Sequence, residues 1–218
     1  CMNGDNNLMI ERKCNLCGSD RKKMIYQENL PHEIDIYRII HSQYLNVNEI
    51  HRKWNYRIVR CVDCGHIYAD PIYNAALVEK SYLEQDHNNQ FAIDDFILQK
   101  TFDGYAKMVE SYLPVRRLVQ VDIGCDTGLF LNATIKFGFK RVIGIEPGSP
   151  AAAAARKIKG VEIWQKIFNE NDFCDAEIDF VSVIHVLDHL VDPLGFLKGL
   201  YRKVNSGGVC FAVVHNIK

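Results

Sequence analysis

A turn between an apolar strand and a helix limits most strongly what this chain can fold into. Residues 118–123 are apolar and strand-like, Gly124-Cys125-Asp126-Thr127-Gly128 follows, and a helix pattern begins directly after it. A second apolar segment, residues 141–145, ends at Glu146, eighteen residues past Gly128. Strands that alternate with helices predict a parallel, doubly wound α/β sheet. Glycines let such a turn approach a ligand, and an acid at the tip of the second strand can accept hydrogen bonds from ribose hydroxyls.

The spacing of the glycines narrows the class of ligand. The turn reads Gly-x-x-x-Gly, whereas the turn that cradles a dinucleotide pyrophosphate reads Gly-x-Gly-x-x-Gly. The spacing therefore predicts a nucleoside ligand without a pyrophosphate, and it argues against a nicotinamide-dependent dehydrogenase.

Three segments carry a resemblance to a known family. Residues 121–130, 142–147 and 178–193 resemble motif I, the acid that follows it and the fourth-strand motif of class I S-adenosylmethionine-dependent methyltransferases. Residues 185–193, HVLDHLVDP, are similar to the HVLEHVPDP stretch of many members. The resemblance covers roughly residues 91–218 and implies a Rossmann-like sheet that binds S-adenosylmethionine.

The resemblance also implies roles for particular residues. Gly124 and Gly128 would fit the turn around the methionine and ribose portions, and Asp122 would orient the turn. Glu146 would take both ribose hydroxyls, because a carboxylate accepts two hydrogen bonds at once. The full set of expected cofactor contacts is Asp122, Gly124, Cys125, Asp126, Thr127, Gly128, Glu146, Pro147, Phe168 and His185.

Two positions depart from the family pattern. Asp126 stands where a middle glycine is common; its side chain would crowd the ligand, although its carboxylate could pair with the cofactor's ammonium group. Ile167 stands where many members place an acid near the adenine, and the neighbouring Phe168 could pack on that ring. Both departures concern affinity rather than fold.

Two histidines follow the fourth predicted strand. His185 and His189 flank Asp188 on the side where a methyl acceptor would lie. Histidine can act as a base near neutral pH, so both are candidate catalytic residues, and His185 is also a candidate cofactor contact. The alternative is that one of them packs against or caps the next helix. The catalytic base stays unassigned.

Four of the eight cysteines form two Cys-x-x-Cys pairs, each followed by glycine. The pairs are Cys14 with Cys17 and Cys61 with Cys64. Such turns direct two sulfurs at one ion, so two pairs predict a closed, structural four-thiolate zinc site. The 43 residues between the pairs imply an insertion in a zinc ribbon. Two unrelated thiol pairs are the alternative.

The chain divides into two predicted domains with a boundary at Pro71: a zinc-binding module, residues 1–72, and a methyltransferase domain, residues 73–218. Residues 56–59 and 67–69 should form a hairpin around the second cysteine pair. The apolar residues between positions 34 and 44 suggest a short helix or strand. They are Ile34, Tyr37, Ile39, Ile40 and Tyr44. Residues 73–117 should be helical, with an aromatic stripe in the core. That stripe is Phe91, Phe96, Ile97, Phe102, Tyr105, Met108, Val109 and Tyr112.

Within the second domain the pattern predicts strands near 118–123, 141–146, 161–165, 179–184 and 208–214, and helices near 129–137, 150–159 and 192–204. Ser149 is the expected N-cap of the second helix, and Gly207-Gly208 the expected end of the last. The family has seven strands, so five indicate a C-terminally truncated piece of a longer protein. A natural five-strand variant, with an exposed apolar edge, is the alternative.

Composition limits the partners. The chain carries 26 basic and 27 acidic side chains, a balance that makes a nucleic-acid partner unlikely. There is no apolar run of membrane-spanning length and no signal pattern, so a cytoplasmic protein without a membrane partner is expected. The oligomeric state and the methyl acceptor are not defined by the sequence.

Two functional hypotheses remain. A zinc module ahead of a methyltransferase domain resembles a bacterial group that includes sugar C-methyltransferases. This arrangement implies S-adenosylmethionine-dependent methyl transfer to a small molecule, such as a nucleotide-linked sugar or a secondary-metabolite precursor. The alternative is a non-catalytic methyltransferase-like scaffold whose zinc ribbon binds protein or RNA.

Overall fold

The computed structural model describes residues 9–29, 55–83 and 95–215. The chain separates into two compact units, residues 1–84 and 85–218. Strand β5 (Ile72–Tyr73) and helix α2 (Ala75–Leu83) fall within the first unit. The domain boundary at residue 72 stays a prediction. The apolar set of residues 34–44, and Phe91, lie outside the described residues.

The first unit contains a three-stranded antiparallel sheet, β2-β3-β4. Its strands are Lys22–Tyr26, Ile58–Cys61 and Ile67–Ala69. The hairpin of β3 and β4 around the second cysteine pair is confirmed, whereas β2 was not predicted. A second, two-stranded sheet joins β1 (Met9–Ile10) to β5. The buried cluster of this unit consists of Cys14, Val59, Cys61 and Tyr68.

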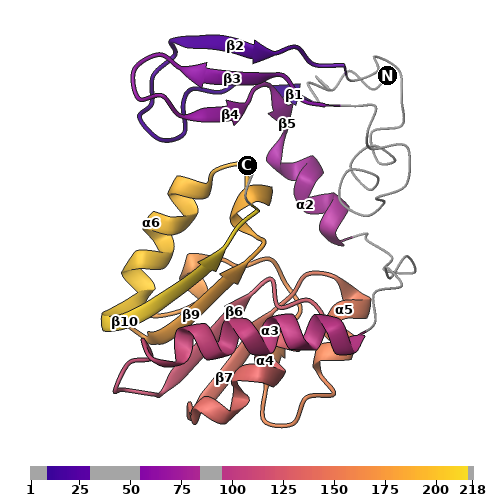
Figure 1. Ribbon diagram of the computed structural model, residues 1–218, viewed down its shortest axis with the longest axis vertical. Coiled ribbons are helices and arrows are strands. Elements are labelled where there is room, and N and C mark those ends of the chain that lie inside the picture. The colour runs from indigo at the N-terminus through magenta and orange to yellow at the C-terminus, as the bar shows by residue number, and fades with distance from the viewer. Residues whose placement is uncertain (1–8, 30–54, 84–94, 216–218) are drawn as a thin grey trace. The chain divides into compact units, whose positions relative to one another are not determined.

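The second unit is built on a parallel five-stranded sheet of order β10-β9-β6-β7-β8 (Figure 1). Its strands are β6 (Val119–Ile123), β7 (Arg141–Ile145), β8 (Glu162–Trp164), β9 (Ile178–Ile184) and β10 (Val204–Val213). Every residue of β6 and β9 is buried. These central strands are mainly apolar, as strands covered on both faces require, and their buried polar side chains are Gln120, Asp122, Asp179 and Ser182. The predicted doubly wound fold is confirmed.

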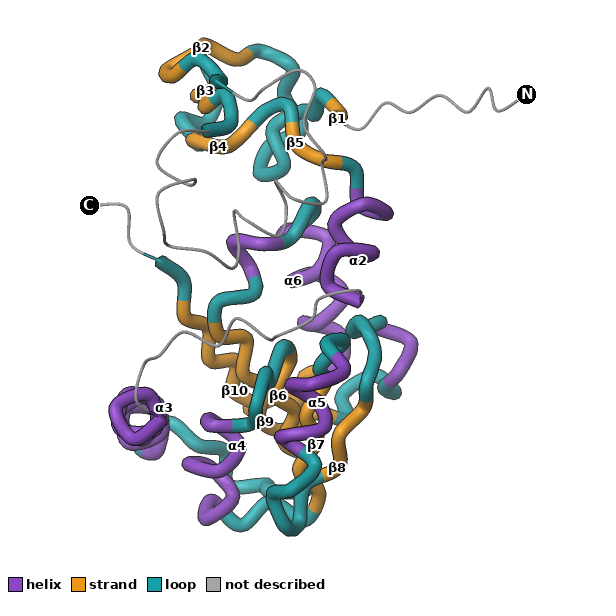
Figure 2. Tube along the Cα trace, turned by 90° about the vertical axis from the view of Figure 1, so that its right-hand side faces the viewer, coloured by secondary structure: helices purple, strands orange, loops and turns teal. Residues whose placement is uncertain are grey.

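Helices cover both faces of this sheet. Helix α3 (Asp95–Glu110), α4 (Leu129–Thr134), continued by η1 (Ile135–Phe137), and α5 (Ser149–Ala155) contribute to one buried cluster. Helix α6 (Pro193–Lys203) contributes Leu200 to the other. Figure 2 shows α3 and α4 together on one side of the strands. Two further 3-10 turns, η2 (Glu170–Asp172) and η3 (Leu187–His189), lie in connections.

A buried carboxylate joins the amino ends of two neighbouring strands. Asp179 of β9 is fully buried, and its Oδ2 accepts hydrogen bonds from the backbone N–H groups of Leu118 and Val119, at 2.8 and 2.9 Å. Its Oδ1 lies 3.2 Å from Nε of Arg116. These contacts satisfy a charge that would otherwise be costly to bury, and they hold β6 in register with β9.

Two predicted helix ends are wrong. The N-cap of α5 is Gly148 rather than Ser149, because the N–H of Ala152 bonds the Gly148 carbonyl oxygen at 2.9 Å and Ser149 is already helical. Helix α6 ends at Lys203, and Gly207 and Gly208 lie in β10, where the pairing register with β9 shifts. The glycines therefore mark an irregularity in a strand.

The predicted stripe on α3 is only partly in the core. Val109 is buried, and Phe102 and Tyr105 pack against the buried cluster. The other members that the structure describes are exposed: Phe96 65%, Ile97 59%, Met108 61% and Tyr112 70%. The prediction was wrong for these four, because the apolar residues extend around more of the helix than the face that meets α4 and the sheet. Among the described residues, none of the helices combines the length and apolar character needed to cross a membrane.

Candidate functional site

The carboxyl end of β6 leads into the glycine turn, which is bonded to the end of β7. The N–H groups of Gly124 and Cys125 both donate to the carbonyl oxygen of Ile145, at 2.8 and 3.1 Å. In an open parallel sheet, ligands bind beyond the carboxyl ends of the strands. The fold therefore places the turn and Glu146 side by side where a ligand is expected.

Both turn glycines are required by conformation and by space. Gly124 has φ 71°, and a Cβ there would lie 2.5 Å from Cγ2 of Val186 in the segment after β9. Gly128 has φ 86°, and a Cβ would lie 2.5 Å from Cδ1 of Ile158. Positive φ favours glycine, and a larger residue would force these contacts apart. The fold alone thus explains both glycines.

Asp126 has a left-handed backbone conformation, which glycine adopts most readily. Its φ is 46°, in the left-handed region that aspartate tolerates better than most residues. Its side chain is exposed, and its N–H donates to Oε2 of Glu146 at 3.0 Å. The side chain of Asp126 is thus accommodated at a left-handed position of the turn without being buried.

Glu146 joins the turn after β6 to the start of α5. Besides the bond from Asp126, its Oε1 accepts the N–H of Gly148 at 2.7 Å. Each carboxylate oxygen has two lone pairs, so each keeps one for a further donor. Burial is the largest influence on this carboxyl and raises its pKa to about 7, while the two backbone donors oppose the rise.

Asp122 is a buried acid within β6. Its side chain accepts a hydrogen bond from the hydroxyl of Ser182 on β9, with Oγ to Oδ1 at 2.6 Å. Burial raises the pKa of Asp122 to about 7. The structure therefore connects this side chain to β9; its predicted role in orienting the turn stays a prediction.

The other predicted contacts differ in their surroundings. Cys125 is buried, and burial raises the pKa of its thiol. Thr127 and Pro147 are half-buried beside Asp126 and Glu146. Phe168 instead belongs to an aromatic group on the η2 and α6 side, with its ring centroid 5.4 Å from that of Phe196.

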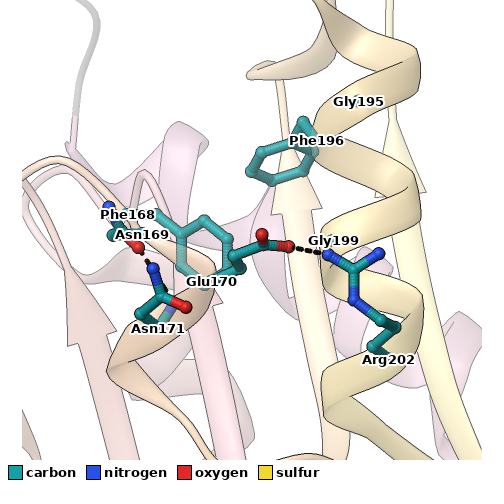
Figure 3. A pocket seen from close by; sticks show the side chains of 8 residues that line it. All are labelled: Phe168, Asn169, Glu170, Asn171, Gly195, Phe196, Gly199 and Arg202. Atoms are coloured by element: carbon teal, nitrogen blue, oxygen red, sulfur yellow. Dashed lines mark hydrogen bonds and ion pairs between the residues drawn. The ribbon is translucent and has the colours of Figure 1, made fainter.

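Phe168 and Phe196 also line an open pocket of about 340 Å³. Figure 3 shows the two rings beside an ion pair between Glu170 and Arg202. The remaining lining residues are Asn169, Asn171, Gly195 and Gly199. Sequence reasoning missed Glu170 and Arg202, since they are 32 residues apart and carry no local motif.

The histidines after β9 form a cluster with a residue that follows β10. The rings of His185 and His215 are stacked, with centroids 4.4 Å apart. Oδ2 of Asp188 lies 3.7 Å from Nε2 of His189 and 3.8 Å from Nε2 of His215. Burial is the largest influence on His185 and His189 and lowers the pKa of each. His215 was missed as a site residue; its place after the strand next to β9 was the available signal.

Asp192, rather than a histidine, caps α6. Its side chain accepts the N–H of Gly195 at 2.9 Å. Neither histidine is therefore the N-cap of α6, whereas the alternative that one of them packs against this helix stays open.

The four predicted zinc ligands come together in the first unit. The Sγ atoms of Cys14 and Cys64 are 3.6 Å apart, those of Cys17 and Cys61 are 3.5 Å apart, and all four lie within 4.8 Å of one another. In each turn the N–H of the following glycine donates to the carbonyl oxygen of the first cysteine. The hydrogen bond from the Cys64 backbone N–H lowers the pKa of Cys61 to about 7.

Comparisons with known proteins also indicate a methyltransferase. The profile of the family described as "Methyltransferase domain" matches residues 99–218. A tRNA U34 carboxymethyltransferase of Sulfurovum sp. is 25% identical over 157 residues, which are 69% of this chain and 51% of the relative. A ubiquinone biosynthesis O-methyltransferase of Rhizobium leguminosarum is 25% identical, covering 56% of this chain and 50% of the relative. The chain thus spans about half the length of these relatives.

Among solved structures, a methyltransferase of Haloferax volcanii, solved in complex with a methyltransferase activator, superposes with a TM-score of 0.47. It is 22% identical, and the match covers 55% of each chain.

The raised pKa of Asp122 predicts a pH-dependent stability. The folded-state pKa of about 7 lies above the unfolded value of about 4, so the folded protein holds this proton more tightly. The stability from Asp122 should therefore be complete below about pH 4 and be lost as pH rises to about 7. Asp122→Asn, which can still accept from Ser182, should lack this loss. Between about pH 5 and 7.5 the wild type should weaken relative to the variant by about 2–3 kcal/mol.

Urea unfolding followed by circular dichroism at the two pH values measures this difference. Glu110→Gln, which changes an exposed acid at the end of α3, is the matched control and should show no such relative change. Parallel pH profiles for the wild type and Asp122→Asn would contradict the prediction.

Proposed function

Because this chain belongs to the methyltransferase-domain family, we propose that its second unit binds S-adenosylmethionine and that the whole protein transfers the methyl group to an acceptor. The observation that carries the proposal is the bond from the N–H of Asp126 to Glu146. It couples the glycine turn to the acid that would hold the ribose.

Glu146 suits two ribose hydroxyls in its observed position. Its two oxygens each accept one backbone N–H, from Asp126 and from Gly148, and each retains a lone pair. The backbone donors hold the carboxylate in one orientation before a ligand arrives, so little conformational entropy is lost on binding. Gly124 and Gly128 keep side-chain atoms out of the turn, and Asp122, Cys125, Thr127, Pro147 and Phe168 are proposed as the surrounding contacts.

Methyl transfer depends mainly on how the protein positions the two reactants. The methyl group of a sulfonium is transferred by in-line displacement, in which a nucleophile attacks as the sulfur leaves with the electron pair of the broken bond. Holding the two reactants aligned can account for much of the rate. His185 and His189 are the proposed acceptor-side groups. Burial lowers the pKa of each, which favours the neutral imidazole that a general base requires.

For the acceptor we propose a small molecule, with a nucleotide-linked sugar or a secondary-metabolite precursor as the finer assignment. One relative is named for action in ubiquinone biosynthesis, and another for action on tRNA. The near balance of 26 basic and 27 acidic residues favours the small molecule, because RNA binding depends on an excess of positive charge. A non-catalytic scaffold is the second candidate, favoured by the side chain of Asp126 within the turn.

We propose that zinc binds the four cysteines of the first unit. A tetrahedral ion with Zn–S bonds of about 2.3 Å needs sulfurs about 3.8 Å apart. This is close to the 3.6 Å observed between Cys14 and Cys64 and the 3.5 Å between Cys17 and Cys61. Four thiolates leave no open position, so the role is structural. The ion would replace much of the apolar core that a unit of this size lacks.

The cofactor proposal predicts a binding defect in one variant. Glu146→Ala should weaken S-adenosylmethionine binding to the full chain by about 1–3 kcal/mol, the cost of leaving ribose hydroxyls unpaired. Isothermal titration calorimetry with S-adenosylmethionine and S-adenosylhomocysteine measures it. Glu110→Ala removes an equal charge from α3 and should bind as the wild type does. Equal affinities for all three proteins would rule out the ribose contact, and an absence of binding in all would favour the scaffold.

The zinc proposal predicts an absorption band that arises from the cysteine thiolates. Cobalt(II) that replaces zinc in the four-cysteine site should give the near-ultraviolet thiolate-to-cobalt charge-transfer absorption, and Cys61→Ser should diminish it because one thiolate is lost. Cys174→Ser changes an exposed thiol and should leave the band intact. A wild-type chain without this band would contradict the assignment.

A further inference from the structure

We propose that His185, Asp188 and His215 bind a second metal ion, a divalent transition metal, at the carboxyl ends of β9 and β10. One ligand atom from each of the three side chains lies within 4.8 Å of the others. An ion with bonds of about 2.0–2.2 Å to nitrogen and oxygen holds its ligand atoms about 3–4.4 Å apart. Small side-chain rotations therefore suffice to bring all three onto one ion.

The backbone already holds the ends of the two strands together. Val213 of β10 is paired with Ile184 of β9, and the N–H of His185 donates to the carbonyl oxygen of Val213 at 2.8 Å. Figure 1 shows the two strands side by side, ending at the same edge of the sheet. His185 and His215 thus follow two adjacent, hydrogen-bonded strands, the kind of rigid support that a binding site needs.

His185 has two features that a purely structural residue would not need. Its φ is 53°, a left-handed conformation that is costly for a bulky residue, and such strain occurs most often at functional sites. Its Nδ1 is buried and has no hydrogen-bond partner among the described residues. An unsatisfied buried nitrogen is destabilising. A ligand that engages this imidazole would offset the cost.

His215 supplies the adjustable part of the site. Its side chain is 69% exposed, so its ring can turn without disturbing the core. In the structure it lies against His185 with 20° between the ring planes, and its Nε2 is 3.8 Å from the carboxylate of Asp188. A turn of this ring would direct a nitrogen toward the space beside both other ligands.

The donor set indicates the class of metal. Two imidazoles and one carboxylate suit zinc, iron(II), cobalt(II) or nickel(II), whereas magnesium and calcium prefer oxygen ligands alone. Three protein ligands also leave coordination positions open. The site therefore differs from the four-thiolate site of the first unit both in its ligands and in its capacity to take a further ligand.

The position of the metal site near the glycine turn indicates a role in methyl transfer. This inference rests on the proposed function. Val186 follows His185 directly and packs against Gly124 of the cofactor turn. An ion beside it would lie next to the cofactor and could bind an oxygen of the methyl acceptor. A metal lowers the pKa of an oxygen bound to it, so the acceptor would lose its proton to solvent or His189 more easily before it attacks the methyl group.

Metal binding by the zinc-loaded full chain, without S-adenosylmethionine, tests the site. Each chain should bind one further ion when cobalt(II) is added. This ion should absorb visible light without adding thiolate-to-cobalt charge-transfer absorption, and magnesium should not displace it. Loss of a partner that merely orients a ligand costs about 10–100-fold in metal affinity. His215→Ala and Asp188→Asn should therefore each weaken binding by more than about 100-fold.

Two controls keep the result interpretable. His189→Ala changes a histidine that is outside the three ligands but lies 3.7 Å from the Asp188 carboxylate, so it should keep the additional ion with an affinity reduced by no more than about 100-fold. His215→Gln retains a polar side chain at an exposed position and should fold normally by circular dichroism, yet lose the ion as His215→Ala does. Absence of a further ion, or equal binding by the wild type and both His215 variants, would overturn the proposal.

Calorimetry with S-adenosylmethionine on the same samples separates the two proposals. Metal binding that depends on His215, without cofactor binding, would support the site and contradict the proposed function. Cofactor binding without a further ion would support the proposed function and overturn the site.

Discussion

The carboxylate of Glu146 is the contact on which the architecture of the site depends. It receives the N–H of Asp126 from the turn after β6 and the N–H of Gly148 from the start of α5. The turn and the start of α5 are thereby both fixed to one side chain at the end of β7. Burial raises the pKa of this carboxyl to about 7, and the two backbone donors oppose the rise by stabilising the charged form.

The order of the strands determines which other residues lie at the carboxyl edge of the sheet. Placing β6 between β7 and β9 puts the glycine turn between Glu146 on one side and His185 on the other. A side chain at Gly124 would meet Val186, and a side chain at Gly128 would meet Ile158, just past α5, and Ala155 at the end of α5. The glycine turn and the segment that carries the histidines are therefore in direct packing contact through Gly124 and Val186.

Much of this could be predicted from the sequence, because it depends on local pattern. Buried strands, the glycine turn and the two cysteine pairs are short-range signals, and the structure has all of them. Three features were beyond the sequence: the partners of Glu146, the pairing of Val204 that ends α6, and the meeting of His185 with His215. Each depends on which backbone atoms tertiary packing brings near a side chain. The exposed half of α3 was misread because an apolar pattern cannot show which face is covered.

The central claim is that Glu146 organises the turn for a ribose. The most direct test is a nuclear magnetic resonance titration of the full chain with S-adenosylhomocysteine, following the amide resonances of Asp126 and Gly148. If ribose hydroxyls bind the same carboxylate, both amides should shift together and saturate with the ligand, while the amide of Ala176, on the loop before β9, stays unchanged. Ligand binding that leaves the Asp126 and Gly148 amides unmoved would contradict the account.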